Sequence, residues 1–127
     1  TKDLAGQKAK ILDLFPALEE HMKRKGGVLS GGQQQQLAIG RALMSNPKML
    51  ILDEPTEGIQ PNVVAEIAHI LNRVRNEMGV TIVVVEQNYR FCRKVADRFI
   101  MMQKGKIVAS GMKEDMSDDL VQKYLSV

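Results

Sequence analysis

The sequence lacks several features that mark particular classes of protein. It has one cysteine, Cys92, so no internal disulfide can form, which fits a reducing compartment. No run approaches the roughly 18 apolar residues needed to span a bilayer, so membrane contact would come through a partner. No signal-peptide pattern is present. The pattern Gly-x-x-x-x-Gly-Lys-Ser/Thr, a loop that cradles nucleotide phosphates, occurs nowhere in the chain.

The charge balance is also unremarkable. A net charge of +3, with no basic stripe interleaved with aromatics, argues against a nucleic-acid partner. The 127 residues, 44% hydrophobic and 26% charged, suit one soluble globular domain or part of one. Because the chain begins at Thr1 rather than Met, we interpret it as a processed product or a fragment.

Apolar spacing and helix-capping residues predict helices in the first part of the chain. The spacing predicts helix from Leu4 to about Met22, divided by Pro16, which suits a first turn but not an interior. Ser30 is placed to cap a further helix that ends at Asn46-Pro47.

Strands and helices then alternate. Met49–Leu52 reads as a strand with cover on both faces, because four consecutive apolar residues leave no solvent side. A helix runs from Pro61 to Gly79, and Thr81–Val85 reads as a second buried strand. This order indicates an α/β fold with a parallel sheet flanked by helices.

The end of the chain predicts smaller elements. We expect a short helix at about 88–96, a β-hairpin around Lys104-Gly105, and a last helix from about Ser117 to Tyr124.

One glycine-containing run suits phosphate binding. In Leu29-Ser30-Gly31-Gly32-Gln33, the small residues sit at a predicted helix N-terminus, where free N–H groups and the helix dipole attract anions. Gly31 and Gly32 would allow close approach of phosphate, and Ser30 adds a hydroxyl. The alternative is an ordinary loop entering a helix.

Two adjacent carboxylates follow the first predicted strand. Asp53 and Glu54 come directly after Leu52, and ligands of parallel sheets sit at the carboxyl ends of strands. Adjacent side chains point in different directions, so one can hold magnesium while the other acts on a water. The alternative is a turn that merely precedes Pro55.

Together, the glycine run and Met49-Leu50-Ile51-Leu52-Asp53-Glu54-Pro55-Thr56 resemble the signature motif and Walker B motif of ATP-binding cassette (ABC) ATPases. The resemblance extends from about Leu4 to the end of the chain. It is closest to ATP-binding subunits of bacterial importers for branched-chain amino acids, amides and urea. That closer match rests on Ala38-Ile39-Gly40-Arg41-Ala42-Leu43-Met44, Thr56-Glu57-Gly58-Ile59-Gln60-Pro61 and Val85-Glu86-Gln87-Asn88.

The resemblance implies a partial P-loop NTPase fold. Residues 1–127 would be the C-terminal portion of one ABC ATPase domain. A signature helical region would cover about 1–46, and the Walker B core and C-terminal region about 47–127. The Walker A loop, the adenine-stacking aromatic residue and the loop that couples to membrane subunits would lie upstream of Thr1.

The resemblance also implies roles for individual residues. The signature run (29–33) would bind the nucleotide held by a second subunit, through Ser30, Gly31, Gly32 and Gln33. Asp53 would hold Mg²⁺ through water. Glu54 would orient or deprotonate the attacking water.

Two departures from the family pattern stand out. Glu57, Gly58, Ile59 and Gln60 form the dimer-interface loop where most members have Ser-Ala-Leu-Asp. Gln87 stands where most members have a histidine that contacts the γ-phosphate. A glutamine amide can donate a hydrogen bond but carries no titrating proton, so we expect Gln87 to sense the γ-phosphate without acid–base chemistry.

The expected function is that of the ATP-binding subunit of an ABC importer for branched-chain amino acids, amides or urea, using ATP and Mg²⁺. It would work with a second ATPase subunit, as a homo- or heterodimer, with membrane permease subunits and with a periplasmic or extracellular substrate-binding protein. It would sit peripherally on the cytoplasmic face of the inner membrane of a bacterial-type cell. The alternatives are a soluble ABC ATPase without a transport role, or a non-enzymatic interaction domain that keeps the signature face.

Overall fold

A computed structural model describes residues 4–22 and 29–125 of the chain. The chain divides into two compact units, Thr1–Val85 and Glu86–Val127. None of the described helices is both long and apolar enough to cross a membrane.

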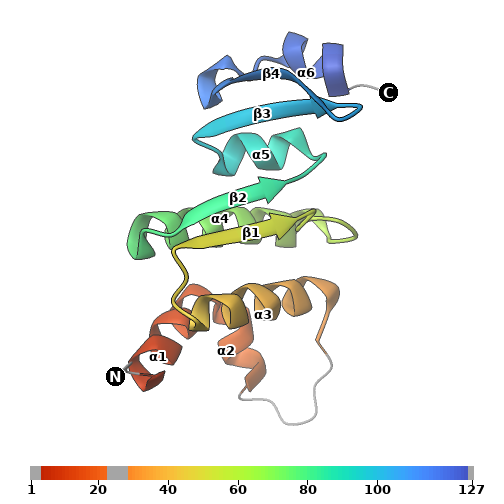
Figure 1. The fold of residues 1–127 in the computed structure, drawn as a ribbon. Coiled ribbons are helices and arrows are strands. Elements are labelled where there is room, and N and C mark those ends of the chain that lie inside the picture. Colours follow the sequence, from red (N-terminus) through yellow and green to blue (C-terminus); the bar gives the residue numbers. More distant parts are fainter. Residues whose placement is uncertain (1–3, 23–28, 126–127) are drawn as a thin grey trace. The chain divides into compact units, whose positions relative to one another are not determined.

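The first unit starts with a cluster of three helices, α1 (Leu4–Leu14), α2 (Pro16–Met22) and α3 (Gly31–Met44), which contact one another (Figure 1). Pro16 divides the first two, as the sequence predicts. The apolar faces of these helices, together with Phe15 between α1 and α2, supply fully or nearly fully buried side chains: Ile11, Leu14, Phe15, Leu18, Ile39 and Leu43.

A parallel strand pair forms the rest of this unit. Strands β1 (Met49–Asp53) and β2 (Thr81–Val85) run in register from Met49↔Thr81 to Asp53↔Val85. Helix α4 (Pro61–Met78) connects them, and Gly79 ends it in the left-handed conformation, with φ 67°. The predicted α/β fold with a parallel strand pair is therefore confirmed, and the carboxyl ends of both strands meet at one edge.

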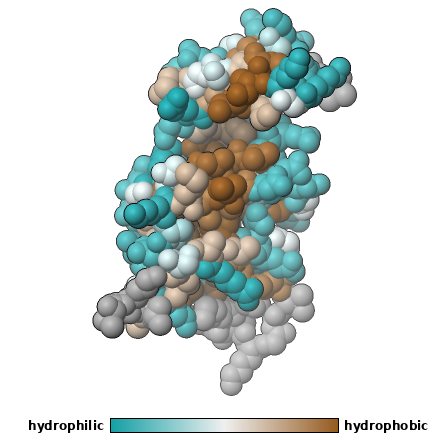
Figure 2. Space-filling view, viewed as in Figure 1, coloured by the Kyte–Doolittle hydropathy of each residue, from teal (hydrophilic) through white to brown (hydrophobic). Residues whose placement is uncertain are grey.

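The expectation that both faces of these strands are covered is wrong for the described part of the chain. Burial alternates along β1: Leu50 and Leu52 are buried, whereas Met49 and Ile51 are 53% and 66% exposed. On β2, Val83 and Val85 are 41% and 55% exposed. Figure 2 shows apolar surface over β1 and β2. Helix α4 contacts β2 through its own apolar stripe and leaves the opposite face of the pair open.

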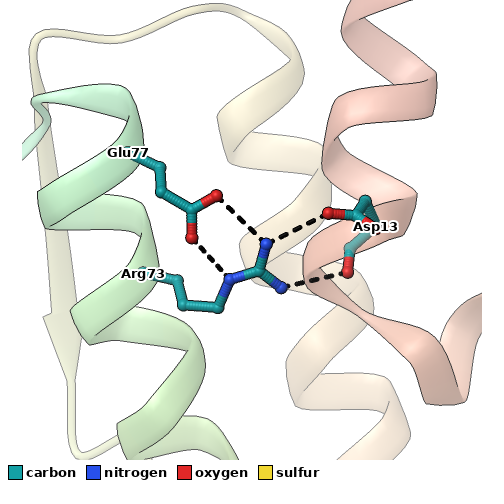
Figure 3. Close-up of polar contacts among 3 residues, drawn as sticks. All are labelled: Asp13, Arg73 and Glu77. Atoms are coloured by element: carbon teal, nitrogen blue, oxygen red, sulfur yellow. Dashed lines mark hydrogen bonds and ion pairs between the residues drawn. The ribbon is translucent and has the colours of Figure 1, made fainter.

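Arg73 ties the helical cluster to α4 (Figure 3). Its Nη1 donates to the backbone oxygen of Asp13, at the end of α1, at 3.2 Å, and its Nη2 donates to Asp13 Oδ2 at 3.0 Å. Nη2 and Nε also donate to the Glu77 carboxylate on the same helix. One planar guanidinium thus joins the C-terminal end of α1 to α4.

The second unit is a helix, a hairpin and a terminal helix. Helix α5 (Tyr89–Val95) precedes the antiparallel strands β3 (Arg98–Gln103) and β4 (Lys106–Met112). Lys104 and Gly105 make the turn, both with positive φ. A 3₁₀ turn, η1 (Lys113–Asp115), leads to α6 (Asp118–Leu125). The predicted hairpin and flanking helices are confirmed. A buried cluster of this unit comprises Phe99, Met101, Met116 and Val121.

The Arg73 ion pairs predict a pH-dependent contribution to stability. Hydrogen bonding from Arg73 holds the pKa of Glu77 below its usual range. A lowered folded-state pKa adds stability above the unfolded-state value, and this is lost as the pH falls through the lowered pKa. We expect Glu77→Gln to be less stable than the wild type at neutral pH, with the difference shrinking in acid as the pH falls through the lowered pKa of Glu77.

Urea unfolding at neutral pH and in acid measures this difference, with Glu66→Gln on the same helix as the charge-matched control. Because Glu77 is half exposed, the effect at neutral pH is small. A difference that persisted unchanged in acid would contradict the ion-pair explanation.

Candidate functional site: a capped glycine run and an acidic strand end

The signature run (29–33) forms the N-terminus of α3, held by a reciprocal cap. The backbone N–H of Gln33 donates to Ser30 Oγ at 3.1 Å, and the N–H of Ser30 donates to Gln33 Oε1 at 3.0 Å. This capping box fixes where the helix begins. Ser30 Oγ accepts in this arrangement, so its own hydrogen stays free to point at an anion. The N–H groups of Gly31 and Gly32 have no intrahelical acceptor at this end.

The two glycines have different surroundings. Gly31 is exposed, and a Cβ added there would meet nothing within 4 Å. Gly32 is buried, and a Cβ there would lie 2.3 Å from Cγ1 of Val63, on the first turn of α4. The surface at Gly31 is therefore open to a ligand, whereas Gly32 is packed against protein.

The acidic strand end combines an exposed carboxylate with an unusual backbone. Asp53 is exposed at the last position of β1. Glu54 follows with φ 48°, in the left-handed region that residues with a side chain rarely occupy. Its N–H donates to the backbone oxygen of Val85, the last residue of β2, at 2.7 Å. Backbone strain of this kind concentrates at functional sites, where the surrounding structure enforces it.

The predicted dimer-interface loop links the strand end to α4. The N–H of Glu57 donates to the carbonyl of Glu54 at 3.2 Å, closing a turn, and Gly58 has φ 71°. Gln60 then caps α4 with its backbone: its carbonyl accepts from Val63 at 3.0 Å and from Val64 at 2.9 Å. Glu57, Gly58 and Gln60 are exposed, and Ile59 is half-buried.

Gln87 belongs to the second unit, two residues after the end of β2. The Glu86 carboxylate accepts from the N–H of Gln87 at 3.0 Å and from that of Asn88 at 3.4 Å. Asn88 in turn caps α5 by accepting from Phe91 N–H at 3.1 Å. This local network fixes the backbone around Gln87, and its role toward a phosphate stays a prediction.

The residues present fit a nucleotide with magnesium. No group of three or more His, Cys, Asp or Glu side chains suited to a metal gathers within 4–22 and 29–125. Magnesium, however, commonly takes only one or two protein carboxylates and completes its shell with water and phosphate oxygens, which Asp53 alone can serve. The open surface at Gly31 leaves room for phosphate at a helix N-terminus.

Thiol chemistry is not part of this picture. Burial raises the pKa of the Cys92 thiol to about 11, so the thiol stays protonated at neutral pH. A protonated, mostly buried thiol is a poor nucleophile.

Three features went unpredicted. The left-handed backbone of Glu54 has no signal in the sequence, because no glycine or asparagine marks the position. Val63 lies within the helix predicted from Pro61 to Gly79, but its contact with Gly32 depends on how two helices meet. Gln36 on α3 is 1% exposed, and its Oε1 has no hydrogen-bond donor among the described residues, which is unusual for a buried amide.

The left-handed backbone at Glu54 predicts that glycine is a more stable replacement there than alanine, the reverse of the usual order. Both Glu54→Ala and Glu54→Gly remove the carboxylate, but only glycine adopts a left-handed backbone without a steric cost. We expect the free energy of unfolding of Glu54→Gly to equal that of Glu54→Ala or to be higher by up to about 1 kcal/mol. At helix and strand positions with negative φ, alanine is the more stable of the two.

Urea denaturation of both variants measures this ranking. The alanine and glycine substitutions at Asp53, which ends a regular strand, are the control. There the alanine variant should be the more stable of the two. Alanine winning clearly at both positions would contradict the strain at Glu54.

The known proteins that this chain resembles belong to one family. Residues 3–57 match the family described as ABC transporter. The high-affinity branched-chain amino acid transport ATP-binding protein BraG of Pseudomonas aeruginosa is 48% identical over 106 residues, covering 84% of this chain and 45% of that protein. The glutamate/aspartate import ATP-binding protein GltL of Escherichia coli is 39% identical over 120 residues, covering 93% of this chain and 49% of that protein. The chain thus spans about half the length of the curated relatives it matches.

Solved structures agree. The ADP conformation of an ATP-binding cassette of an ABC transporter matches with a TM-score of 0.79 and 32% identity, covering 98% of this chain and 49% of that chain. A dimeric cassette in a post-hydrolysis state, bound to ADP and Pi, matches with a TM-score of 0.65 and 31% identity, covering 87% of this chain and 46% of that one. By its motifs, its fold and these likenesses, the chain belongs to the ATP-binding cassette family of ABC transporters.

Proposed function

We propose that residues 1–127 are the C-terminal portion of the ATPase domain of an ABC importer, whose full-length subunit couples ATP hydrolysis to uptake. The observation that carries this proposal is the strained Glu54, directly after the exposed Asp53 at the carboxyl end of a parallel strand pair. A carboxylate enforced in that position suits action on a water beside a phosphate. The family membership supports the reaction class.

The two carboxylates would divide the work. Asp53, exposed at the end of β1, would hold magnesium through water. When bound, magnesium would neutralise negative charge on the β- and γ-phosphates. Glu54 would orient or deprotonate the attacking water. The hydrogen bond from its N–H to Val85 fixes its backbone and so limits where its carboxylate can reach.

The signature run would act on a nucleotide held by a second ATPase subunit. Ser30 Oγ and the N–H groups of Gly31 and Gly32 are donors at one helix end, and Gln33 keeps Ser30 in place. The loop at Glu57, Gly58, Ile59 and Gln60, exposed except for the half-buried Ile59, would lie at the interface between subunits. Gln87 would donate a hydrogen bond to the γ-phosphate. The dimeric, ADP-bound cassette supports such an assembly.

The open apolar face of β1 and β2 suggests what completes the domain. Four exposed aliphatic or thioether side chains, on Met49, Ile51, Val83 and Val85, form a face that a parallel strand pair ordinarily buries. We propose that the other half of the cassette, with the phosphate-binding loop, packs on this face. The half-length matches to curated relatives support this proposal.

The proposed cargo is a branched-chain amino acid, an amide or urea. The relative named for branched-chain amino acid transport is 48% identical, against 39% for the one named for glutamate/aspartate import. Urea stays among the proposed cargoes because the run Glu57-Gly58-Ile59-Gln60-Pro61 resembles that of urea importers. The subunit would sit on the cytoplasmic face of the membrane, bound to permease subunits that receive cargo from a substrate-binding protein.

The 127-residue chain alone should not hydrolyse ATP. It lacks the Gly-x-x-x-x-Gly-Lys-Ser/Thr loop that holds the nucleotide of its own subunit. A phosphate-release assay on the purified chain measures this. Turnover that Glu54→Gln abolishes would overturn the prediction.

Sequencing the coding DNA upstream of Thr1 tests the same proposal independently. An in-frame phosphate-binding loop supports the transporter ATPase. A start codon immediately before Thr1, without such a loop, would favour an interaction domain that binds an intact cassette without turnover.

In the full-length subunit, Glu54→Gln should keep ATP binding and dimer closure but lose hydrolysis about 10²- to 10⁴-fold, because the amide keeps the shape of the side chain without its basicity. Steady-state ATPase rates and size-exclusion chromatography with ATP measure the two effects. Glu66→Gln on α4 is the control and should turn over normally. Unchanged turnover in Glu54→Gln would remove Glu54 from its assigned role.

A further inference from the structure

The contact between Gly32 and Val63 joins two segments that the proposed function treats as separate. Gly32 is the second residue of α3, within the signature run, and Val63 is on the first turn of α4. A Cβ at Gly32 would lie 2.3 Å from Val63 Cγ1 and 3.2 Å from Val63 Cβ. Real Cβ atoms do not approach that closely, so the two backbones can be this near only because residue 32 has no side chain.

Val63 cannot easily give way. Its side chain is β-branched, and in a helix such side chains occupy essentially one χ1 rotamer. Its N–H donates to the carbonyl of Gln60 at 3.0 Å, which holds it at the start of α4. Pro61 further restricts the backbone of that turn.

The contact therefore forms a short mechanical path. The exposed loop at residues 57–60 ends in Gln60, whose carbonyl binds the N–H of Val63. The side chain of Val63 then abuts the backbone of Gly32, next to the N–H groups of the helix terminus. These contacts connect the loop to the signature run through the first turn of α4.

Gly31 provides the contrast within the same run. A Cβ there meets nothing within 4 Å, so no protein packing requires a glycine at this position. The neighbouring glycines thus face different constraints: open surface at Gly31, and the side chain of Val63 at Gly32.

We propose that Val63 is a positioning residue that sets the place of the signature run relative to the 57–60 loop. Residue 32 is a glycine because a side chain there would leave no room for Val63. The inference rests on the proposed function, in which the signature run contacts a nucleotide. It assigns the position of that run to packing inside one subunit rather than to nucleotide binding. A misplacement of about 1 Å at such a site costs about 100-fold in rate.

The test is a rescue experiment in the full-length subunit. We expect Gly32→Ala to lower kcat about 100-fold, because the new methyl group collides with Val63 and displaces the helix terminus. Adding Val63→Ala removes the colliding Cγ1 and should restore kcat to within about tenfold of the wild type, since coupled sites are not additive. Adding Val63→Thr, which keeps the β-branched shape, should restore nothing.

Matched controls separate packing from contact with the nucleotide. Val63→Ala should not rescue Gly31→Ala, because Gly31 does not touch Val63. Val63→Ala alone should lower kcat severalfold with little change in KM for ATP, well below its Tm. A merely structural role would lower Tm and leave kcat unchanged at that temperature.

The outcomes distinguish this inference from the proposed function. A wild-type subunit with no ATPase activity would overturn the proposed function, and the positioning role with it. An active wild type in which Val63→Ala fails to rescue Gly32→Ala, or in which Val63→Thr rescues equally well, would overturn the positioning role alone. Selective rescue by Val63→Ala supports it.

Discussion

Burial of one helical stripe holds the first unit together. Ile67, Ile70, Leu71 and Val74 of α4 are at most 2% exposed, and each such side chain contributes about 1.5–3 kcal/mol when removed from water. The same helix contacts β2, reaches α1 through Arg73 and meets α3 at Val63. The strand end and the signature run therefore take their positions from a shared support.

Local chemistry explains why most elements were predictable. Pro16 and Pro61 each open a helix, Ser30 caps one, and Gly79 ends one in the left-handed conformation. These signals act within a turn of the residue that carries them, so no knowledge of the tertiary structure is needed. The strand at residues 49–52 was predictable from local sequence as well, because it is a run of four apolar residues.

The sequence could not reveal features that depend on two distant segments meeting. The exposure of Ile51 depends on which layers lie against β1, and an apolar run cannot say which are present. The backbone of Glu54 is fixed by a hydrogen bond to Val85, and the need for glycine at position 32 comes from Val63. The family resemblance could name residues for the site, but it could not say which of them carry strain or packing constraints.

If the other half of the cassette packs on β1 and β2, as proposed, their open face has a consequence for a chain whose synthesis is unfinished. Met49, Ile51, Val83 and Val85 make an apolar patch on a strand pair whose outer edges pair with no other strand among the described residues, a combination that promotes self-association. A copy released without its covering layer would present this patch to chaperones and proteases. Under that proposal, exposure of this face would distinguish a chain whose other half has not folded onto it from a complete cassette.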